Sequence, residues 1–236
     1  QWRFASIIVK FLLFILKKIK ASLDFLRKKD RDYRIFGAKR HRYETKLLSE
    51  DEILKFEKSE AINLPEAFRL FLLNIGYGAG PDYGIYSFKK MKESYREFCG
   101  CFDEESSMSD SFTLRTQDAE ELITLKKEKP KEFHYKRLEN VNGVLPIQTE
   151  GCTYYALLVL NGEQKGKIWA VDTNEFDTLP SGLTQELDFL SWYERWLDNS
   201  IEKVIKKKEE LKKIQKDERY ITSKKKSLWS RLFGIN

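Results

Sequence analysis

The feature that most constrains the fold is a stretch of about thirty residues, 144–172, that contains strand patterns and turns but no helical pattern. Apolar and β-branched side chains predominate in residues 144–148, 153–160 and 167–172. Asn161-Gly162 and Gly166 mark the turn between the last two segments. Three strands joined in this way predict an antiparallel meander.

Helical patterns flank this stretch on both sides. Ser49 and Glu52 have the spacing of a capping box, which predicts the start of a helix. Leu64-Pro65-Glu66 predicts the start of a second helix. A proline at the first helical position loses no hydrogen bond, and a glutamate there complements the positive end of the helix dipole. Gly76 ends this helix. An aromatic-rich segment from Leu187 predicts a closing helix that continues into a lysine-rich tail. Helices, a meander and a closing helix predict an α+β fold.

Four glycines between residues 76 and 84 could be taken for a phosphate-binding loop. They follow a helix and precede residues 85–88, which we interpret as a strand, whereas a nucleotide loop leads from a strand into a helix. We therefore interpret them as a tight structural turn. From 91 to 137 the pattern is weak and predicts one helix, near 118–129, and an acidic, serine-rich loop at 103–111.

The formal net charge of +6 is unevenly distributed. Residues 1–29 carry 8 Lys or Arg against 1 Asp or Glu, and residues 201–236 carry 12 against 5, so each end has a net charge of +7. Residues 30–200 carry 23 against 31, a net charge of −8. The length suits one domain with extensions. We place a basic amphipathic helical extension at 1–32, the domain at 33–200 and a lysine-rich helical tail at 201–236.

Acidic runs in the domain are the candidate contacts for a partner. An acidic face repels phosphate, which argues against nucleic acid and favours a cationic protein surface drawn in by long-range attraction. A simpler interpretation is that these side chains only keep the domain soluble. The candidate residues are Asp103, Glu104, Glu105, Asp172, Glu175 and Asp177.

Cys99, Cys101 and Cys152 are too few for a disulfide scaffold, and with two distant histidines they do not form a four-ligand metal site. We expect free thiols, a reducing cytoplasm and no metal or other cofactor. The carboxylates lie in loop runs without a matching histidine or serine motif. We therefore expect no catalytic activity and no small-molecule substrate.

Apolar residues recur at helical spacing between 4 and 26, with lysines on the other side, which predicts an amphipathic helix. Its apolar run is shorter than the roughly 20 residues that span a membrane. Lys10 interrupts the run and no small-residue cleavage site follows, which argues against a signal peptide. Three interpretations stay open: packing on the domain, contact with a membrane surface, or sequence upstream of the natural start. The candidate membrane contacts are Phe11 and Leu12 in this helix and Trp229 and Phe233 in the tail.

Several segments, in their order and spacing, resemble the SUKH superfamily with its Smi/Knr-type domain. They are residues 48–53, 62–69 and 75–85 in the first half, and 146–147, 151–152, 157–162, 166–169 and 189–193 in the second. The resemblance covers roughly residues 33–200. Gly76-Tyr77-Gly78 stands where the family usually has Gly-Asn-Gly, which leaves the turn intact.

The resemblance implies a SUKH-like fold, with an antiparallel meander packed against helices, and a non-catalytic binding role. Bacterial members are mostly immunity proteins that neutralise polymorphic toxins, often nucleases, by direct binding. Fungal relatives regulate cell-wall synthesis through protein contacts. The implied partner is a protein, such as a cognate toxin domain met in the cytoplasm. The alternative is a peripheral membrane or scaffolding protein that acts through its basic termini.

Overall fold

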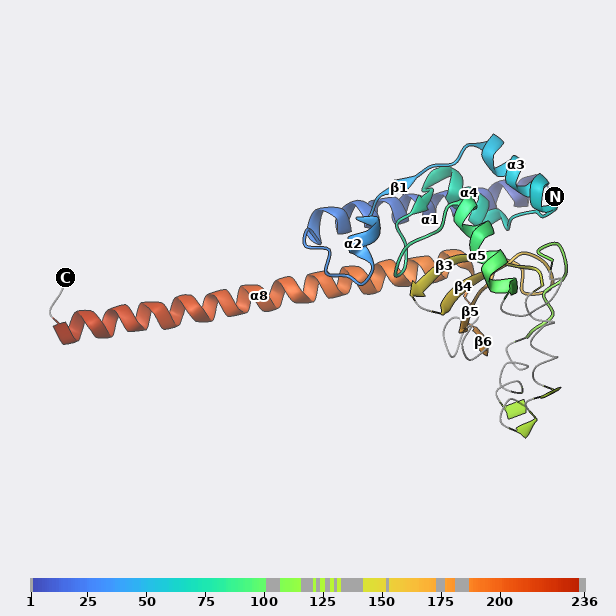
Figure 1. Cartoon of the computed structure of the whole chain (residues 1–236). Coiled ribbons are helices and arrows are strands. Elements are labelled where there is room, and N and C mark those ends of the chain that lie inside the picture. The colour runs from blue at the N-terminus through green and yellow to red at the C-terminus, as the bar shows by residue number, and fades with distance from the viewer. Residues whose placement is uncertain are drawn as a thin grey trace.

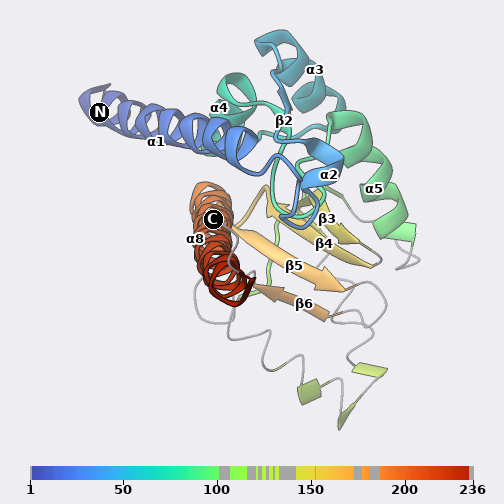
Figure 2. The ribbon, with the colours of Figure 1, turned by 90° about the vertical axis from the view of Figure 1, so that its left-hand side faces the viewer.

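The computed structural model describes residues 2–100, 107–115, 121, 124–125, 128–129, 131–132, 142–151, 153–172, 177–180 and 187–233. For residues 2–8, 98–100, 172, 177–180, 217 and 220–233 it describes the backbone alone. A sheet and several helices form one body, from which the last helix projects far outward (Figure 1). Figure 2 looks along that helix and shows helices above the sheet. The predicted α+β fold with helical termini is confirmed.

The main sheet is the predicted antiparallel meander, extended by one strand. Its order is β3-β4-β5-β6, with bounds β3 (Val144–Gly151), β4 (Tyr154–Val159), β5 (Ile168–Asp172) and β6 (Asp177–Pro180). From Ala156 to Val159, strand β4 is buried on both faces. Leu158 belongs to the core shared with the helices, while Leu157 pairs with Trp169, whose ring lies 5.1 Å from that of Phe112. This double burial explains why β4 is continuously apolar instead of alternating.

A second, two-stranded sheet and three helices cover one side of the meander. They are β1 (Thr45–Lys46), α3 (Glu50–Glu60), α4 (Glu66–Asn74), β2 (Tyr77–Gly78) and α5 (Phe88–Gly100). The predicted capping box starts α3: the Ser49 backbone N–H donates to Glu52 at 2.8 Å, and the Glu52 N–H donates to the Ser49 hydroxyl at 3.3 Å. Helix α4 begins directly after Pro65, as the sequence indicates.

The predicted strand at 85–88 is wrong. Ile85 forms only an isolated bridge with Gly78, and α5 begins at Phe88. The reason is local: Ser87 starts the helix by accepting the Met91 N–H at 2.8 Å on its carbonyl, and the buried Met91 then faces the core. Of the helix predicted near 118–129, residues 121, 124–125 and 128–129 are described; the backbone is helical at the first four of these positions and not at 129.

The glycine-rich segment is a structural turn. Gly76 has a φ of +93° and follows the end of α4. Gly84 has a φ of +86°, and a Cβ there would lie 1.9 Å from the Gly78 carbonyl oxygen. The two glycines therefore permit a reversal and a backbone approach that a larger residue would block.

The terminal helices pack against each other. Helix α1 (Trp2–Lys29) is the predicted amphipathic helix, and it buries Leu16, Ile19, Leu23 and Leu26 in the core. Helix α8 (Phe189–Phe233) is the predicted closing helix and runs unbroken into the tail. The segment between α1 and β1 contains the short α2 (Ala38–His41). Of the three interpretations of the N-terminal segment, the structure shows packing on the domain.

Candidate interaction surfaces

Of the six acidic residues predicted to contact a partner, the structure describes two, and these by their backbone. Asp103, Glu104, Glu105 and Glu175 lie outside the described residues. Asp172 ends β5, Asp177 begins β6, and the antiparallel register places the two opposite each other. Two of the six are therefore paired positions on adjacent strands.

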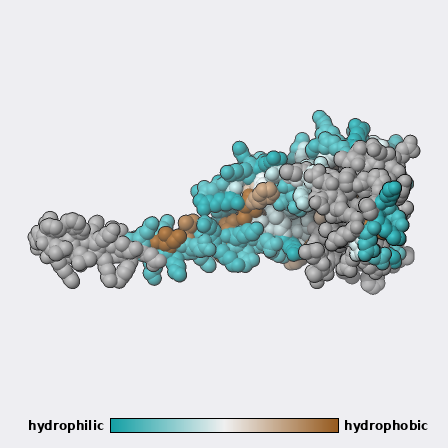
Figure 3. All heavy atoms as spheres, turned by 60° about the horizontal axis from the view of Figure 1, so that its bottom comes forward, coloured by the Kyte–Doolittle hydropathy of each residue, from teal (hydrophilic) through white to brown (hydrophobic). Residues whose placement is uncertain are grey.

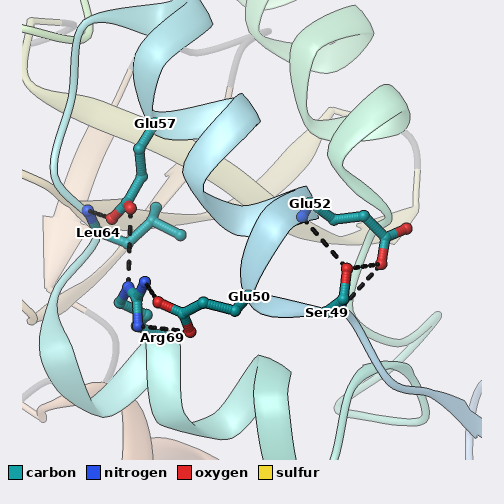
Figure 4. Close-up of polar contacts among 6 residues, drawn as sticks. All are labelled: Ser49, Glu50, Glu52, Glu57, Leu64 and Arg69. Carbon is teal, nitrogen blue, oxygen red and sulfur yellow. Dashed lines mark hydrogen bonds and ion pairs between the residues drawn. The ribbon is translucent and has the colours of Figure 1, made fainter.

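Arg69 on α4 joins two carboxylates of α3 (Figure 4). Its Nη1 lies 3.1 Å from Glu50 Oε2, and its Nε lies 3.7 Å from Glu57 Oε2. Glu57 also accepts the backbone N–H of Leu64 at 2.8 Å. The hydrogen bond from the Arg69 guanidinium holds the pKa of Glu50 below its ordinary value. These carboxylates tie α3 to α4 instead of facing a partner.

Asp82 and Glu150 form a second pair of carboxylates, where the glycine turn meets β3. The fully buried Gln148 donates from Nε2 to Asp82 Oδ2 at 2.8 Å. Burial raises the pKa of Asp82, and burial together with the Asp82 charge raises the pKa of Glu150. A cationic side chain brought against this pair would favour ionisation of both.

A buried polar network anchors the segment that follows α1. Asp30 is 5% exposed and accepts the Tyr43 hydroxyl at 2.6 Å and the Arg34 backbone N–H at 2.8 Å. Arg27 on α1 donates to the Tyr43 carbonyl at 2.5 Å. Satisfied in this way, the buried carboxylate fixes the segment against the end of α1.

His41 is a core residue. Its Nδ1 accepts the Tyr43 backbone N–H at 3.0 Å, and its ring packs edge-on against Tyr43 and Trp196, at 5.3 and 5.9 Å between centroids. Burial lowers the pKa of His41 to about 4, partly offset by the Gly80 backbone. Among the described residues, no group of three or more His, Cys, Asp or Glu is placed to hold a metal ion.

A hollow of about 870 Å³ opens where α1 ends and α8 continues, and we call it the interhelical groove. Apolar side chains form part of its lining, with seven cations and two carboxylates around them. The lining residues are Lys28, Lys29, Asp30, Arg31, Asp32, Arg34, Ile35, Phe36, Lys203, Val204, Lys207, Lys208 and Leu211. The groove thus joins apolar surface to positive potential, the reverse of the predicted acidic face.

Two smaller hollows of about 290 Å³ each adjoin the groove. One shares Val204 with it and adds Phe25 and Ile205. The other shares Phe36 and adds Trp192, among further residues. Figure 3 shows apolar residues in a row along the projecting helix, bordered by hydrophilic ones. The sequence does not reveal this groove, because its two walls lie far apart in the chain and only the packing of α1 on α8 joins them.

The predicted membrane contacts fall into different environments. Phe11 is 62% exposed, whereas Leu12 is partly buried against the core. Trp229 and Phe233 belong to the last turns of α8, where the structure describes the backbone and not the side chains. Within the described part of the chain, no helix combines the length and the apolar character needed to cross a membrane.

The order of elements, the capped α3, the glycine turn and the meander together fit one known domain type. A model of the SMI1 / KNR4 family (SUKH-1) matches residues 47–196, more than half of the chain. The chain belongs to the SMI1 / KNR4 family. The resemblance to the SUKH superfamily that the sequence indicates is thereby confirmed. Searches of curated proteins and of solved structures found no match.

The SUKH-1 match does not include all of the folded body. It covers α3 to α5, the meander and the first turns of α8, and it leaves out α1, the segment to residue 46 and α8 after residue 196. Yet α1 buries four side chains in the same core. All residues that line the interhelical groove lie outside the match. The groove is therefore built by the parts that this chain adds to the SUKH-1 domain.

Proposed function

We propose that this SUKH-1 protein is a non-catalytic immunity protein that neutralises a toxin by binding the toxin domain directly. The observation that carries the proposal is its membership of the SMI1 / KNR4 family, since bacterial proteins of the superfamily are mostly of this kind. The proposed partner is a toxin domain with a basic surface, such as a nuclease. The proposed place of action is the cytoplasm, in keeping with the small, odd number of cysteines.

The charge of the domain supports a cationic partner. Residues 30–200 carry 31 acidic against 23 basic side chains. Strand pairing sets Asp172 opposite Asp177, so two of the predicted contacts are neighbouring positions in the sheet. An acidic surface of this kind would resemble the phosphate backbone to a nuclease and would accelerate association by long-range attraction.

Association of the purified full-length protein with the toxin domain encoded beside its gene tests this proposal. We expect a complex whose association rate falls about tenfold or more between low salt and roughly 0.3 M salt, because salt screens the attraction. Reversing Asp172 and Asp177 to lysine, or Asp103, Glu104 and Glu105 to lysine, should slow association further. The control is Glu163→Lys, an exposed residue of the β4–β5 turn, which should leave the rate within about twofold.

The absence of any complex with the adjacent toxin domain would overturn the proposal. A complex that forms at a salt-independent rate would overturn only the electrostatic attraction. If Glu163→Lys slows association as much as the reversals do, general net charge would explain the effect better than these sites.

A second candidate function is attachment to an anionic membrane, and the outer face of α1 favours it. Phe11 and Phe14 are 62% and 66% exposed although the opposite face of α1 is buried. Lys10, Lys17 and Lys18 lie close to them in the helix. Exposed aromatic rings beside cations suit the interface of an anionic bilayer.

Flotation with vesicles that contain phosphatidylserine tests this second function. The full-length protein should float, and Phe11→Ser with Phe14→Ser should reduce the floating fraction severalfold, as should Trp229→Ser with Phe233→Ser. Leu54→Ser, at a residue of α3 that is 49% exposed, is the control. Point substitutions are required because deletion of α1 would also remove core residues. Unchanged flotation of both pairs would exclude the membrane function.

A further inference from the structure

The interhelical groove lies where an apolar stripe of α8 loses its cover. Val204 packs against the core beside α1. Leu211, seven residues on, lies on the same face of the helix and is 42% exposed, and Ile214 is 53% exposed. Helix α1 ends at Lys29, so the stripe continues past the helix that covers its beginning (Figure 1).

The opposite wall of the groove is firmly held. It is made by the segment after α1, which Asp30 fixes through its bonds to Tyr43 and to the backbone of residues 34 and 35. Phe36 from this wall is 59% exposed. A large exposed aromatic ring on a fixed backbone, lining the same groove as the exposed Leu211, is the composition of a protein-binding surface.

The charge of the groove determines which sign of charge its ligand should carry. Seven of its lining residues are cationic, and its two carboxylates are both engaged. Asp30 is bonded as described, and Asp32 lies 2.9 Å from Arg34. The groove therefore attracts an acidic partner.

We propose that the interhelical groove binds an acidic amphipathic helix of a protein partner, separate from the partner of the acidic domain. A helix fits because α1 already packs against α8, where Val204 begins this stripe. A flat bilayer does not follow a concave groove. A second copy of this chain would bring its own lysine-rich α8 against these lysines, and like charges would oppose the contact. An acidic amphipathic helix offers both the apolar face and the charge that the groove lacks.

A pair of synthetic peptides tests the proposal on the full-length protein. The probe is a labelled 18-residue helix with leucines on one face and glutamates elsewhere. Its matched control has the same composition with the leucines spread around the helix. Fluorescence anisotropy should show at least tenfold weaker binding of the control peptide, because only the first peptide buries its apolar face while keeping its charges at the rim.

Substitutions in α8 locate the binding site. Lys207→Glu with Lys208→Glu, and separately Leu211→Ser, should each weaken binding of the amphipathic peptide about tenfold or more. Lys206→Glu with Lys213→Glu is the matched control, since it makes the same change of charge on the same helix at residues outside the groove and its neighbouring hollows. This control should bind within about threefold of the unchanged protein. Circular dichroism and thermal unfolding confirm that each variant is folded.

Three results would overturn the proposal. The first is no binding of the amphipathic peptide, or equal binding of both peptides. The second is equal loss of binding in the groove variants and in the control variant. The third is that the peptide does not bind, whereas phosphatidylserine vesicles bind the unchanged protein and bind the groove variants more weakly. That result would assign the groove to a membrane surface.

Discussion

A single histidine gives the folded chain a sensitivity to acid. His41 is 8% exposed and its pKa is lowered to about 4, whereas in the unfolded chain it returns to about 6.5. Between pH 4 and pH 6.5, His41 binds a proton in the unfolded chain but stays neutral in the folded chain. The stability that His41 contributes above pH 6.5 is therefore lost as the pH falls towards 4.

Replacement of His41 by glutamine should remove this loss. Between pH 7 and pH 4.5, the unchanged protein should lose about 2 to 3 kcal/mol more of its free energy of unfolding than His41→Gln does. Urea unfolding at a series of pH values measures both curves. Asp82 and Glu150, whose pKa values are raised, affect both proteins alike and cancel in the difference. Parallel curves would contradict the assignment to His41.

Alanine substitution at two glycines with the same φ angle distinguishes the cost of backbone strain from the cost of a steric clash. Gly84 and Gly166 both have a φ of +86°. A Cβ at Gly84 would lie 1.9 Å from a carbonyl oxygen, whereas a Cβ at Gly166 would lie 3.7 Å from Pro65 Cβ, an ordinary contact. Gly166→Ala should cost about 1 to 2 kcal/mol for its left-handed backbone alone. Gly84→Ala should cost clearly more in the same denaturation experiment, and equal costs would show that the turn relaxes.

At the scale of elements, α1 is part of the core although it lies outside the SUKH-1 match. Leu23→Ala should lower the free energy of unfolding by about 2 to 5 kcal/mol, because it empties a buried site between helices. Phe14→Ala, in the same helix but 66% exposed, should change it by about 0.5 kcal/mol or less. Chemical denaturation measures both. Similar small effects would mean that α1 is not firmly docked.

The elements that the sequence predicts well are those specified within a few residues. The cap at Ser49 and the turns around Gly162 and Gly166 need only near neighbours, and they appear as expected. Helix α5 is harder to predict, because Lys89 and Lys90 interrupt its apolar pattern, and its packing on β3 adds to the local start at Ser87. In α1, the helical period alone does not determine which face is buried. The packing of α1 on α8 and α4 determines that face. The groove depends wholly on such packing.

At the scale of the whole molecule, the acidic candidate contacts and the groove belong to different structural parts. Asp172 and Asp177 lie on β5 and β6, whereas residues from 28–36 and 203–211 line the groove. In Figure 1, β5 and β6 lie in the sheet of the body, while α8 leads away from it. Charges at physiological salt are screened over about 8 Å. Two surfaces separated in this way can bind partners of opposite charge without competing.

We therefore expect a ternary complex of this protein, the proposed toxin domain and the acidic amphipathic peptide. Saturation with the toxin domain should leave the affinity for the peptide within about twofold, because binding at one surface removes no contact or charge from the other. Anisotropy of the labelled peptide, measured with and without the toxin domain, checks this, and sedimentation identifies the three-component species. The groove variant Leu211→Ser should lose the peptide and keep the toxin domain, whereas Asp172→Lys with Asp177→Lys should weaken only the toxin complex. Mutual exclusion of the two ligands would show that one surface serves both.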